Sequence, residues 1–418
     1  MNTNNLLYGI DERPPLGKLA LFSLQMMLSV FVATVLIANI CGVAVSGALF
    51  GAGLSTLIYI LVTQGKSPMF VSNSGAFVAP VIFALSIGGH YAVAIGGLVT
   101  CIVYSIFSVV FTRIPVENIY KVFPKALIGS VTMVIGINLM PFILTYVQVN
   151  GAANSWGLLV AFVTMFVIAI ISHYSKGIFK VLPFLIGTAI GYALAIILTV
   201  AGVAPLVDFS VFKNLTLFQL PDLALTHWQA APIKALIPVV IMYIAYTISA
   251  MMEALSDHAA LGNIIGTDLY RNPGLGKIFR AEGLANLAGS VFGGLGICSY
   301  GEGVACIGFS RVASVWTTGG AAIFLIILSI LAPVQALIAS IPGCVFAGAA
   351  IILYGFIACS GVKMLKYVDL NVSKNLILVS TVLSLGISGL VVGNATISLS
   401  ATALALVSGV ALNLILKD

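Results

Sequence analysis

Long apolar stretches recur from one end of the chain to the other, separated by short loops that are polar or rich in glycine. Most stretches approach the length of roughly 20 residues that a helix needs to cross the hydrocarbon core of a bilayer. The pattern predicts about fourteen membrane segments, near residues 17–40, 45–63, 74–88, 91–112, 124–146, 155–173, 180–202, 232–255, 257–266, 282–297, 302–333 (a short helix and a full span), 341–360, 373–391 and 397–416. We therefore expect an all-α polytopic membrane protein.

The composition of the chain favours the same class. Of the 418 residues, 61% are hydrophobic and 7% are charged, whereas a soluble domain carries about 25% charged residues. The six cysteines form no CxxC pair, and the four histidines are scattered. We expect free buried thiols, no metal site and no cofactor. The net charge of +6 is interpreted as a sign of topology, with the lipid bilayer and not nucleic acid as the partner.

Lysine and arginine are distributed unevenly between alternate loops. Most lie before the first predicted span or after the second, fourth, sixth, ninth and twelfth, and one ends the chain: Arg13, Lys18, Lys66, Arg113, Lys121, Lys125, Lys176, Lys180, Arg271, Lys277, Arg280, Lys363, Lys366, Lys374 and Lys417. The intervening loops 40–45, 88–91, 147–154 and 392–396 hold none. The positive-inside rule then places both termini in the cytoplasm of a multi-pass protein of the inner membrane.

The same distribution divides the chain into two halves of similar length. Residues 1–16 lack the features of a cleaved signal and are interpreted as a cytoplasmic lead-in. The first half is 17–202, the sizeable outer loop is 203–231 and the second half is 232–418.

Two segments break the apolar pattern at corresponding positions in the two halves. One is Pro68–Phe77 and the other is Gly294–Gly303; each has a short β-prone run, then small polar residues, then a short apolar helix. Irregular backbone at membrane depth is tolerated where it lines a cavity or is buried in protein. Such a matched pair points to the central site of a transporter, although two ordinary glycine-rich kinks would give the same pattern.

Three carboxylates, Glu253, Asp257 and Glu302, lie in otherwise apolar surroundings. The chain has only 12 acidic residues, and a charge at the centre of a bilayer costs roughly 2.5–3.5 kcal/mol on insertion scales. These residues are therefore the first candidates for a substrate site and a proton path.

Glu253 and Asp257 are four residues apart, which places them on one face of a helix about one turn apart. Two carboxylates so close in a medium of low dielectric constant do not both ionise readily, and a carboxyl that changes protonation is what a proton-coupled carrier needs. A pair that only stabilises the fold, or an Asp257 that caps the next helix, remains an alternative. His258 is either a second proton-handling group or a loop residue without a role.

Glu302 lies between Gly301 and Gly303, which allow the backbone and a ligand to approach closely. If a short helix begins here, its first amides point into the same cavity. A carboxylate beside free amides suits a small planar ligand that carries N–H next to C=O. Tyr300 and Phe77 would stack on a flat ligand, unless they only contribute to packing.

Several motifs along the chain resemble one family. They are Asp11-Glu-Arg-Pro-Pro-Leu16, Ser23-Leu-Gln25, Gly65-Lys-Ser-Pro68, Ala76-Phe77, Asp268-Leu-Tyr-Arg-Asn-Pro-Gly274, Tyr300-Gly-Glu302 and Ser310-Arg-Val312. On these motifs the chain resembles the nucleobase–ascorbate transporter family, also called nucleobase:cation symporter-2, and is most similar to its bacterial uracil permease branch.

The resemblance implies two inverted repeats of seven segments, divided into core and gate domains, with short strands in the third and tenth segments. It implies that Glu253 and Glu302 bind substrate, with Tyr300 and Gly301 beside Glu302, and it implies a homodimer through the gate domain. At the position of Asp257 the uracil permease branch carries histidine, and the xanthine and uric-acid members are similar to this chain in carrying aspartate.

The chain also departs from the family pattern. The glutamine-histidine pair of the first segment reads Gln25-Met26, a phenylalanine of the third segment is replaced by Gly75, the signature asparagine is Gly303, and the following glycine is Ala305. These changes remove a polar partner, an aromatic wall and an amide donor, so we expect a roomier pocket than that of a uracil site.

The combined expectation is a proton-coupled nucleobase importer that works by alternating access, and not an enzyme. Glu253 and Glu302 would bind ring N–H groups, the backbone at Gly75, Gly301 and Gly303 would meet carbonyl oxygens, and Asp257 with His258 would carry the proton. Uracil is favoured. A purine such as xanthine or uric acid is the alternative, as is an anion carrier or channel on the same architecture, which the carboxylates argue against. Sodium as the coupling ion stays open.

Overall fold

The computed structural model describes residues 6–113, 121, 123–141, 143, 147–149, 152–176, 179, 182–213, 216–390, 392–393, 398–399 and 401–416. Parts of the predicted segment 124–146 and of the predicted loops 147–154 and 392–396 lie outside these residues, as do Lys180 and Lys417.

The described residues form fourteen α-helices and only short strands. The helices of the first half are α1 (Leu16–Cys41), α2 (Val45–Val62), α3 (Val78–Arg113), α5 (Lys125–Leu139), α7 (Ser155–Tyr174) and α8 (Pro183–Val200). Those of the second half are α9 (Ile233–Ile265), α10 (Leu275–Ala288), α11 (Gly301–Ser310), α12 (Val315–Ile330), α13 (Ala332–Ser340), α14 (Gly343–Leu365), α15 (Ser373–Ile387) and α16 (Ala401–Ile415).

Short turns and strands connect these helices. The turns are η2 (Gly75–Phe77), η4 (Phe209–Phe212), η5 (Ala224–His227), η6 (Tyr270–Gly274) and η7 (Gly289–Gly293). The strands are β1 (Val71–Asn73), β2 (Gln148–Val149), β3 (Ala152–Ala153), β4 (Ile297–Ser299), β5 (Val392–Gly393) and β6 (Ser398–Leu399).

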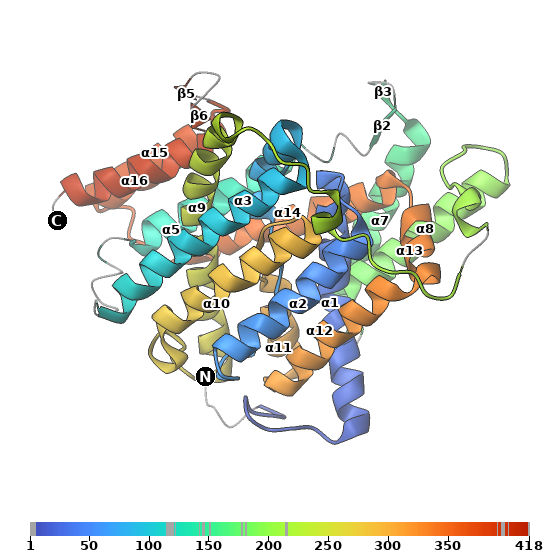
Figure 1. The fold of residues 1–418 in the computed structure, drawn as a ribbon, viewed down its shortest axis with the longest axis horizontal. Coiled ribbons are helices and arrows are strands. Elements are labelled where there is room, and N and C mark those ends of the chain that lie inside the picture. The colour runs from blue at the N-terminus through green and yellow to red at the C-terminus, as the bar shows by residue number, and fades with distance from the viewer. Residues whose placement is uncertain are drawn as a thin grey trace.

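Helices from the two halves of the chain pack against each other. Figure 1 shows α10, α2 and α12 side by side, with α15 and α16 together at one side of the molecule. α3 packs along α10 and α9, and α14 packs along α5 and α7. The two halves therefore share one hydrophobic core.

Seven described helices are long and apolar enough to cross a membrane: α1, α2, α3 (counted from Gly75), α7, α8, α9 and α14. Shorter apolar helices accompany them. On the outer helix α7 large apolar side chains such as Phe162, Phe166 and Ile170 are exposed, and such a surface is stable when lipid covers it. The prediction of a mostly helical membrane protein is confirmed.

The two strands that the breaks in the apolar pattern predicted are both present, and they pair with each other. β1 runs antiparallel to β4, with Val71 opposite Ser299 and Asn73 opposite Ile297. The buried residue Thr34 of α1 holds the strand in place: its hydroxyl lies 2.8 Å from that of Ser72, and Asn73 Nδ2 donates to its backbone carbonyl at 3.2 Å. One strand from each half thus meets its partner inside the protein.

Two predicted boundaries in the second half are wrong. The segments predicted at 232–255 and 257–266 are one continuous helix, α9. The polar residues between Glu253 and His258 suggested an end, but none of them is a glycine or a proline, so nothing there breaks the helix. The segment predicted at 282–297 begins earlier, as α10, and ends in η7 and in Gly294, whose φ of 69° is the left-handed conformation that favours glycine.

In the first half, the segments predicted at 74–88 and 91–112 meet at a sharp break inside α3, at Gly88 and Gly89, and Gly89 has a φ of 59°. The short helix α13 was not predicted.

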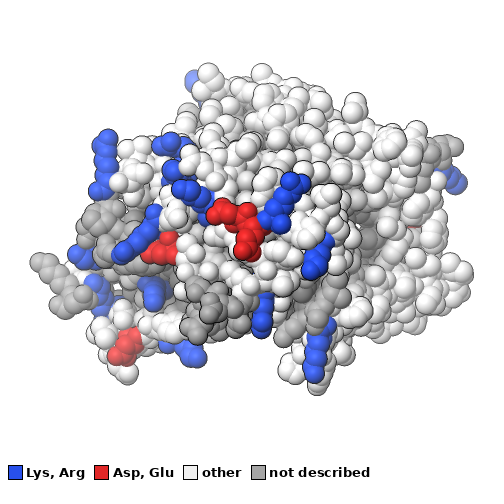
Figure 2. Space-filling model, turned by 90° about the horizontal axis from the view of Figure 1, so that it is seen from below, with Lys and Arg blue, Asp and Glu red and all other residues white. Residues whose placement is uncertain are grey.

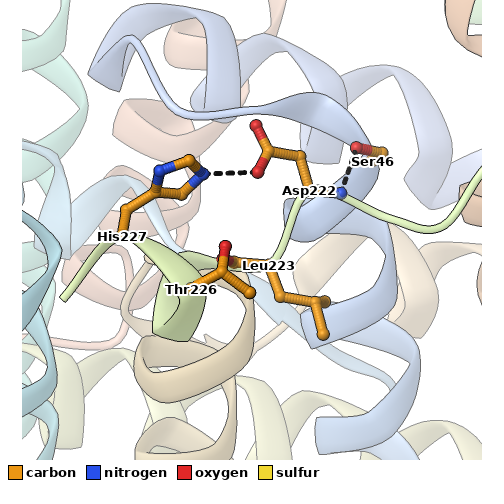
Figure 3. Close-up of polar contacts among 5 residues, drawn as sticks. All are labelled: Ser46, Asp222, Leu223, Thr226 and His227. Carbon is orange, nitrogen blue, oxygen red and sulfur yellow. Dashed lines mark hydrogen bonds and ion pairs between the residues drawn. The ribbon is translucent and has the colours of Figure 1, made fainter.

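Basic side chains gather at one end of the bundle. Figure 2, seen from the end where the described N-terminal residues lie, shows lysine and arginine side chains gathered across this face. We call it the basic face. At the other end, the loop 203–231 folds back onto α2 (Figure 3), where the Asp222 amide donates to Ser46 Oγ at 3.1 Å and the Asp222 carboxylate pairs with His227 at 2.5 Å.

Candidate substrate site

The candidate site lies where α9 passes the ends of β1 and β4. Ser74, the residue after β1, donates from its hydroxyl to Glu253 Oε2 at 3.1 Å and accepts from the Ala76 amide at the start of η2. Its own amide donates to the Gly296 carbonyl at 2.9 Å. The first break in the apolar pattern therefore orients the Glu253 carboxylate.

The second break supplies the opposite wall of the site. α11 begins at Gly301 with Glu302 in its first turn, and its N-cap residue Tyr300 makes no side-chain cap hydrogen bond. Gly301 is exposed, and a Cβ added there would lie 3.7 Å from Asp257 Oδ1. The partly buried carboxylates Glu253, Asp257 and Glu302 lie close enough to interact electrostatically. The structure thus brings the three predicted carboxylates together.

The predicted spacing of Glu253 and Asp257 on one helix is confirmed, because both lie on α9. Asp257 does not cap a following helix, because α9 continues for two more turns beyond it to Ile265. His258 is not a loop residue. It is 1% exposed and points to α2, where its Nε2 lies 2.7 Å from the Tyr59 hydroxyl.

The two candidate aromatic residues differ in their surroundings. Phe77 is 1% exposed and stacks on Tyr243 of α9, with ring centroids 6.0 Å apart. It therefore packs in the core. Tyr300 is 6% exposed, and its hydroxyl has no hydrogen-bond partner among the described residues. Of the two, Tyr300 is the one with a polar group to offer.

The positions that depart from the family pattern are filled by neighbouring side chains. A Cβ added at Gly75 would come 2.8 Å from Leu139 Cδ1 of α5, so Leu139 occupies the space that we expected to be open. A Cβ at Gly303 would lie 3.0 Å from Phe70 Cβ and 3.8 Å from Met26 Sδ. The Gly303 amide already donates to the Tyr300 carbonyl at 3.0 Å. Only Gly301 of the three glycines is free of such neighbours.

A fourth buried carboxylate, Glu282 of α10, was missed in the sequence. It is 0% exposed, and neither of its carboxylate oxygens has a hydrogen-bond partner in the described part of the chain. It interacts electrostatically with Asp257 and Glu253, and both Glu282 and Asp257 approach Ser299 of β4. The signal in the sequence was an acidic residue among alanine, glycine and leucine, at the first position of the predicted segment 282–297.

This arrangement is suited to hydrogen bonding with a small polar molecule. The carboxylates of Glu253 and Glu302 are acceptors, and the first amides of α11 are donors whose helix dipole favours a partial negative charge. Among the described residues, no three His, Cys, Asp or Glu side chains form a group that could hold a metal ion. A planar ring with N–H beside C=O matches acceptors and donors placed side by side.

Comparison with known proteins gives a consistent result. Residues 17–394 match the model of a permease family, that of the xanthine/uracil permeases. The uracil permease of Bacillus caldolyticus is 31% identical over 419 residues, covering 99% of this chain and 95% of that protein. The uracil permease of Escherichia coli (strain K12) is 32% identical over 416 residues, covering 98% and 94%.

Solved structures with the same fold are more distant in sequence. The transmembrane domain of the cyanobacterial bicarbonate transporter BicA superposes with a TM-score of 0.65 at 15% identity, covering 96% of this chain and 98% of that one. The murine anion transporter Slc26a9 in its inward-facing state superposes with a TM-score of 0.71 at 11% identity, covering 97% and 69%. These likenesses concern the fold alone.

Proposed function

The chain belongs to the xanthine/uracil permease family, and we propose that it is a proton-coupled importer of uracil. It is a multi-pass membrane transporter and not an enzyme. The observation that carries the proposal is that Glu253 and Glu302, from different parts of the chain, lie within electrostatic range of each other at the start of α11. Several relatives of the chain are named uracil permeases.

In the proposed binding mode, Glu253 and Glu302 accept hydrogen bonds from the two ring N–H groups of uracil. The amide at Gly301 meets a carbonyl oxygen, because Gly301 is exposed and its neighbours leave room for a ligand. Gly75 and Gly303 allow close packing of the backbone in the walls of the uracil site, and Tyr300 and Phe77 pack in the same walls. Asp257 changes protonation during the cycle, and His258 assists it.

The architecture supports alternating access in the following form. The halves 17–202 and 232–418 are inverted repeats, joined by the loop 203–231 and divided between core and gate domains, and β1 and β4 are their equivalent strands. The basic face is cytoplasmic by the positive-inside rule, so that the lead-in 1–16 and the C-terminus lie inside the cell. A homodimer through the gate domain belongs to the same proposal.

The family resemblance favours a purine instead of uracil at one position, because it implies that xanthine and uric-acid members carry aspartate where this chain has Asp257. Against it, Leu139 fills the space beside Gly75 that we expected to be open for a larger ring. The fold likeness to anion transporters favours an anion carrier, but the carboxylates that line the site repel anions.

Uptake measurements test the proposal. Vesicles that contain the protein are given an inward proton gradient and radiolabelled uracil, with unlabelled uracil, xanthine, hypoxanthine, uric acid or ascorbate as competitors. We expect gradient-dependent uptake that unlabelled uracil blocks. Uptake of labelled xanthine but not of uracil would establish the purine alternative, and uptake that depends on sodium and not on the proton gradient would contradict the coupling.

A further inference from the structure

The helix α11 brings Glu302 to the candidate site but is packed against protein on one side only. It has ten residues and is therefore about 15 Å long. Its buried residues are Gly303, Val304, Cys306 and Ile307. Other positions along the helix, among them Ala305 and Gly308, are exposed. The position of such a helix depends strongly on what holds its two ends.

Different contacts hold the two ends of α11. Its first residues follow β4, which pairs with β1. At its other end, the Arg311 amide donates to the Ile307 carbonyl at 2.9 Å, and Arg311 has a φ of 59°, a left-handed conformation that is uncommon outside glycine. The chain then continues without helix through residues 312–314, and α12 begins at Val315. The partners of this connecting segment therefore help to set where α11 ends.

The N-terminal residues 7–10 lie along this connecting segment, and we call them the strap. Tyr8 and Val312 form a parallel β-bridge. Three backbone hydrogen bonds of 2.8–3.0 Å join the two stretches: from the Leu7 amide to the Arg311 carbonyl, from the Ala313 amide to the Tyr8 carbonyl, and from the Val315 amide to the Ile10 carbonyl. The strap thus pairs with the chain from the end of α11 to the start of α12.

The strap is also attached to α1. The Tyr8 ring packs edge-on against Phe22 of α1, with ring centroids 6.1 Å apart. The paired residues Val312 and Ala313 are 2% and 0% exposed. α1 packs along α11 and α12, and its Thr34 lies in hydrogen-bond contact with β1. The same helix therefore contacts the strand pair at the start of α11 and, through the strap, the end of α11.

We propose that the strap is a positioning element of the substrate site, because it fixes one end of α11 and thereby the place of Glu302 at the other end. Backbone hydrogen bonds make a helix of about three turns a rigid rod, so a displacement at Arg311 is passed on to Gly301. A binding group has to be held within roughly 0.5 Å of its productive position. The strap acts through α11 and does not contact the substrate. This inference rests on the proposed uracil site and assigns the N-terminal lead-in a part in it.

The test compares two N-terminal deletions of the purified protein by calorimetric titration with uracil. Deletion of residues 2–10 removes the strap but keeps Arg13 and Lys18, which the positive-inside rule needs for the topology. Deletion of residues 2–5 leaves every contact of the strap in place and is the matched control. We expect wild-type affinity in the control and at least about tenfold weaker binding without the strap, because small misplacements of a contact group are costly.

A double-mutant cycle separates positioning from a general loss of stability. In the Glu302→Gln background, the deletion of residues 2–10 should weaken uracil binding by at most about threefold, because the carboxylate that the strap positions is absent. In the Glu253→Gln background it should keep its full effect, since Glu253 lies on α9. A purely structural role would lower the thermal midpoint and act equally in both backgrounds.

Leu7→Pro is the second variant, which carries the test if the deletion does not fold. It removes the amide that donates to the Arg311 carbonyl, at a position whose side chain is 55% exposed. One lost hydrogen bond should weaken uracil binding by about threefold.

Two results would overturn the role of the strap: wild-type affinity in both the deletion of residues 2–10 and Leu7→Pro, or an equal effect of the deletion in the Glu253→Gln and Glu302→Gln backgrounds. Absence of uracil binding by the wild type, with the protein folded, would instead overturn the uracil site itself, and the part of the strap in it.

Discussion

The two breaks in the apolar pattern, around β1 and around β4, are paired in space but differ in what they contribute. After β1, Ser74 contributes a hydroxyl. In the three-residue turn η2 that follows, Gly75 lies against Leu139 and Phe77 stacks on Tyr243, so the turn is packed against protein. After β4, Gly301 is exposed and a full helix begins with Glu302 in its first turn. The first break supports the Glu253 carboxylate from behind, and the second presents a carboxylate and amides to the site.

This difference indicates that two similar segments can have different roles in a substrate site, one positioning a side chain and the other contacting the substrate. Strand pairing fixes both backbones relative to each other through the register of Val71 with Ser299. The side chains that follow are then free to differ. We therefore expect substitutions after β4 to affect substrate recognition most, and substitutions after β1 to act through the position of Glu253.

The largest effect is expected for Glu302→Gln. It removes the only charged acceptor that the second break contributes, and hydrogen bonds to charged groups are worth about 1.5–3 kcal/mol. We expect transport to be abolished while the protein stays folded and inserted. Uptake assays on membranes with matched protein levels measure this, with Glu12→Gln at the exposed lead-in as the control. Near-normal uptake in Glu302→Gln would remove Glu302 from the site.

Asp257→Asn should alter the pH dependence of transport more than the affinity for substrate. Asp257 faces Gly301 but lies one turn from Glu253 on α9. We therefore propose that Asp257 carries the coupling proton and does not bind the uracil ring. Uptake rates and half-saturating uracil concentrations measured across a range of external pH test this. An unchanged pH profile would remove Asp257 from the proton path.

Ser74→Ala should weaken uracil binding by only about threefold, because the net contribution of a typical hydrogen bond is about 0.5–1.5 kcal/mol and this one acts on Glu253 and not on the substrate. The substitution removes the donor to Glu253 Oε2 and leaves that carboxylate in place. A competition assay with unlabelled uracil gives the affinity. An effect as large as that of Glu302→Gln would mean that the first break contacts substrate directly, and would contradict these different roles.

The smallest effect is expected for Gly75→Ala. The new methyl group would press on Leu139 Cδ1, which is the end of a flexible side chain. We therefore expect the free energy of unfolding to fall by no more than the roughly 1–3 kcal/mol that overpacking costs. Thermal unfolding of the purified protein should show a lower midpoint. Leu139→Ala removes buried volume and lowers the midpoint by itself, so the comparison is a double-mutant cycle: Gly75→Ala should lower the midpoint less in the Leu139→Ala background than in the wild type. An equal change in both backgrounds would show that the strain lies elsewhere.

Local sequence pattern was sufficient to predict some of the strands and buried carboxylates of this molecule. The β-prone runs before Ser74 and before Tyr300 predicted both strands, and the rarity of acids in apolar surroundings predicted three of the four buried carboxylates. The continuity of α9 was missed because polarity was taken for a helix end, when those polar side chains face protein.

The remaining features depend on tertiary contacts that no local pattern contains. Leu139 fills the space beside Gly75 from a helix more than sixty residues away in the sequence. Tyr59 meets His258 across a separation of 199 residues. The placement of Glu282 beside Ser299 and Asp257 follows from the packing of α10 against β4.

The most direct test of the central claim is calorimetric titration of uracil into the purified protein and into Glu253→Gln, Glu302→Gln and Glu12→Gln. The account predicts saturable binding to the wild type and to Glu12→Gln, weakened roughly tenfold to a hundredfold by either of the other two substitutions. Equal affinity in all four proteins would contradict a uracil site built on these two carboxylates.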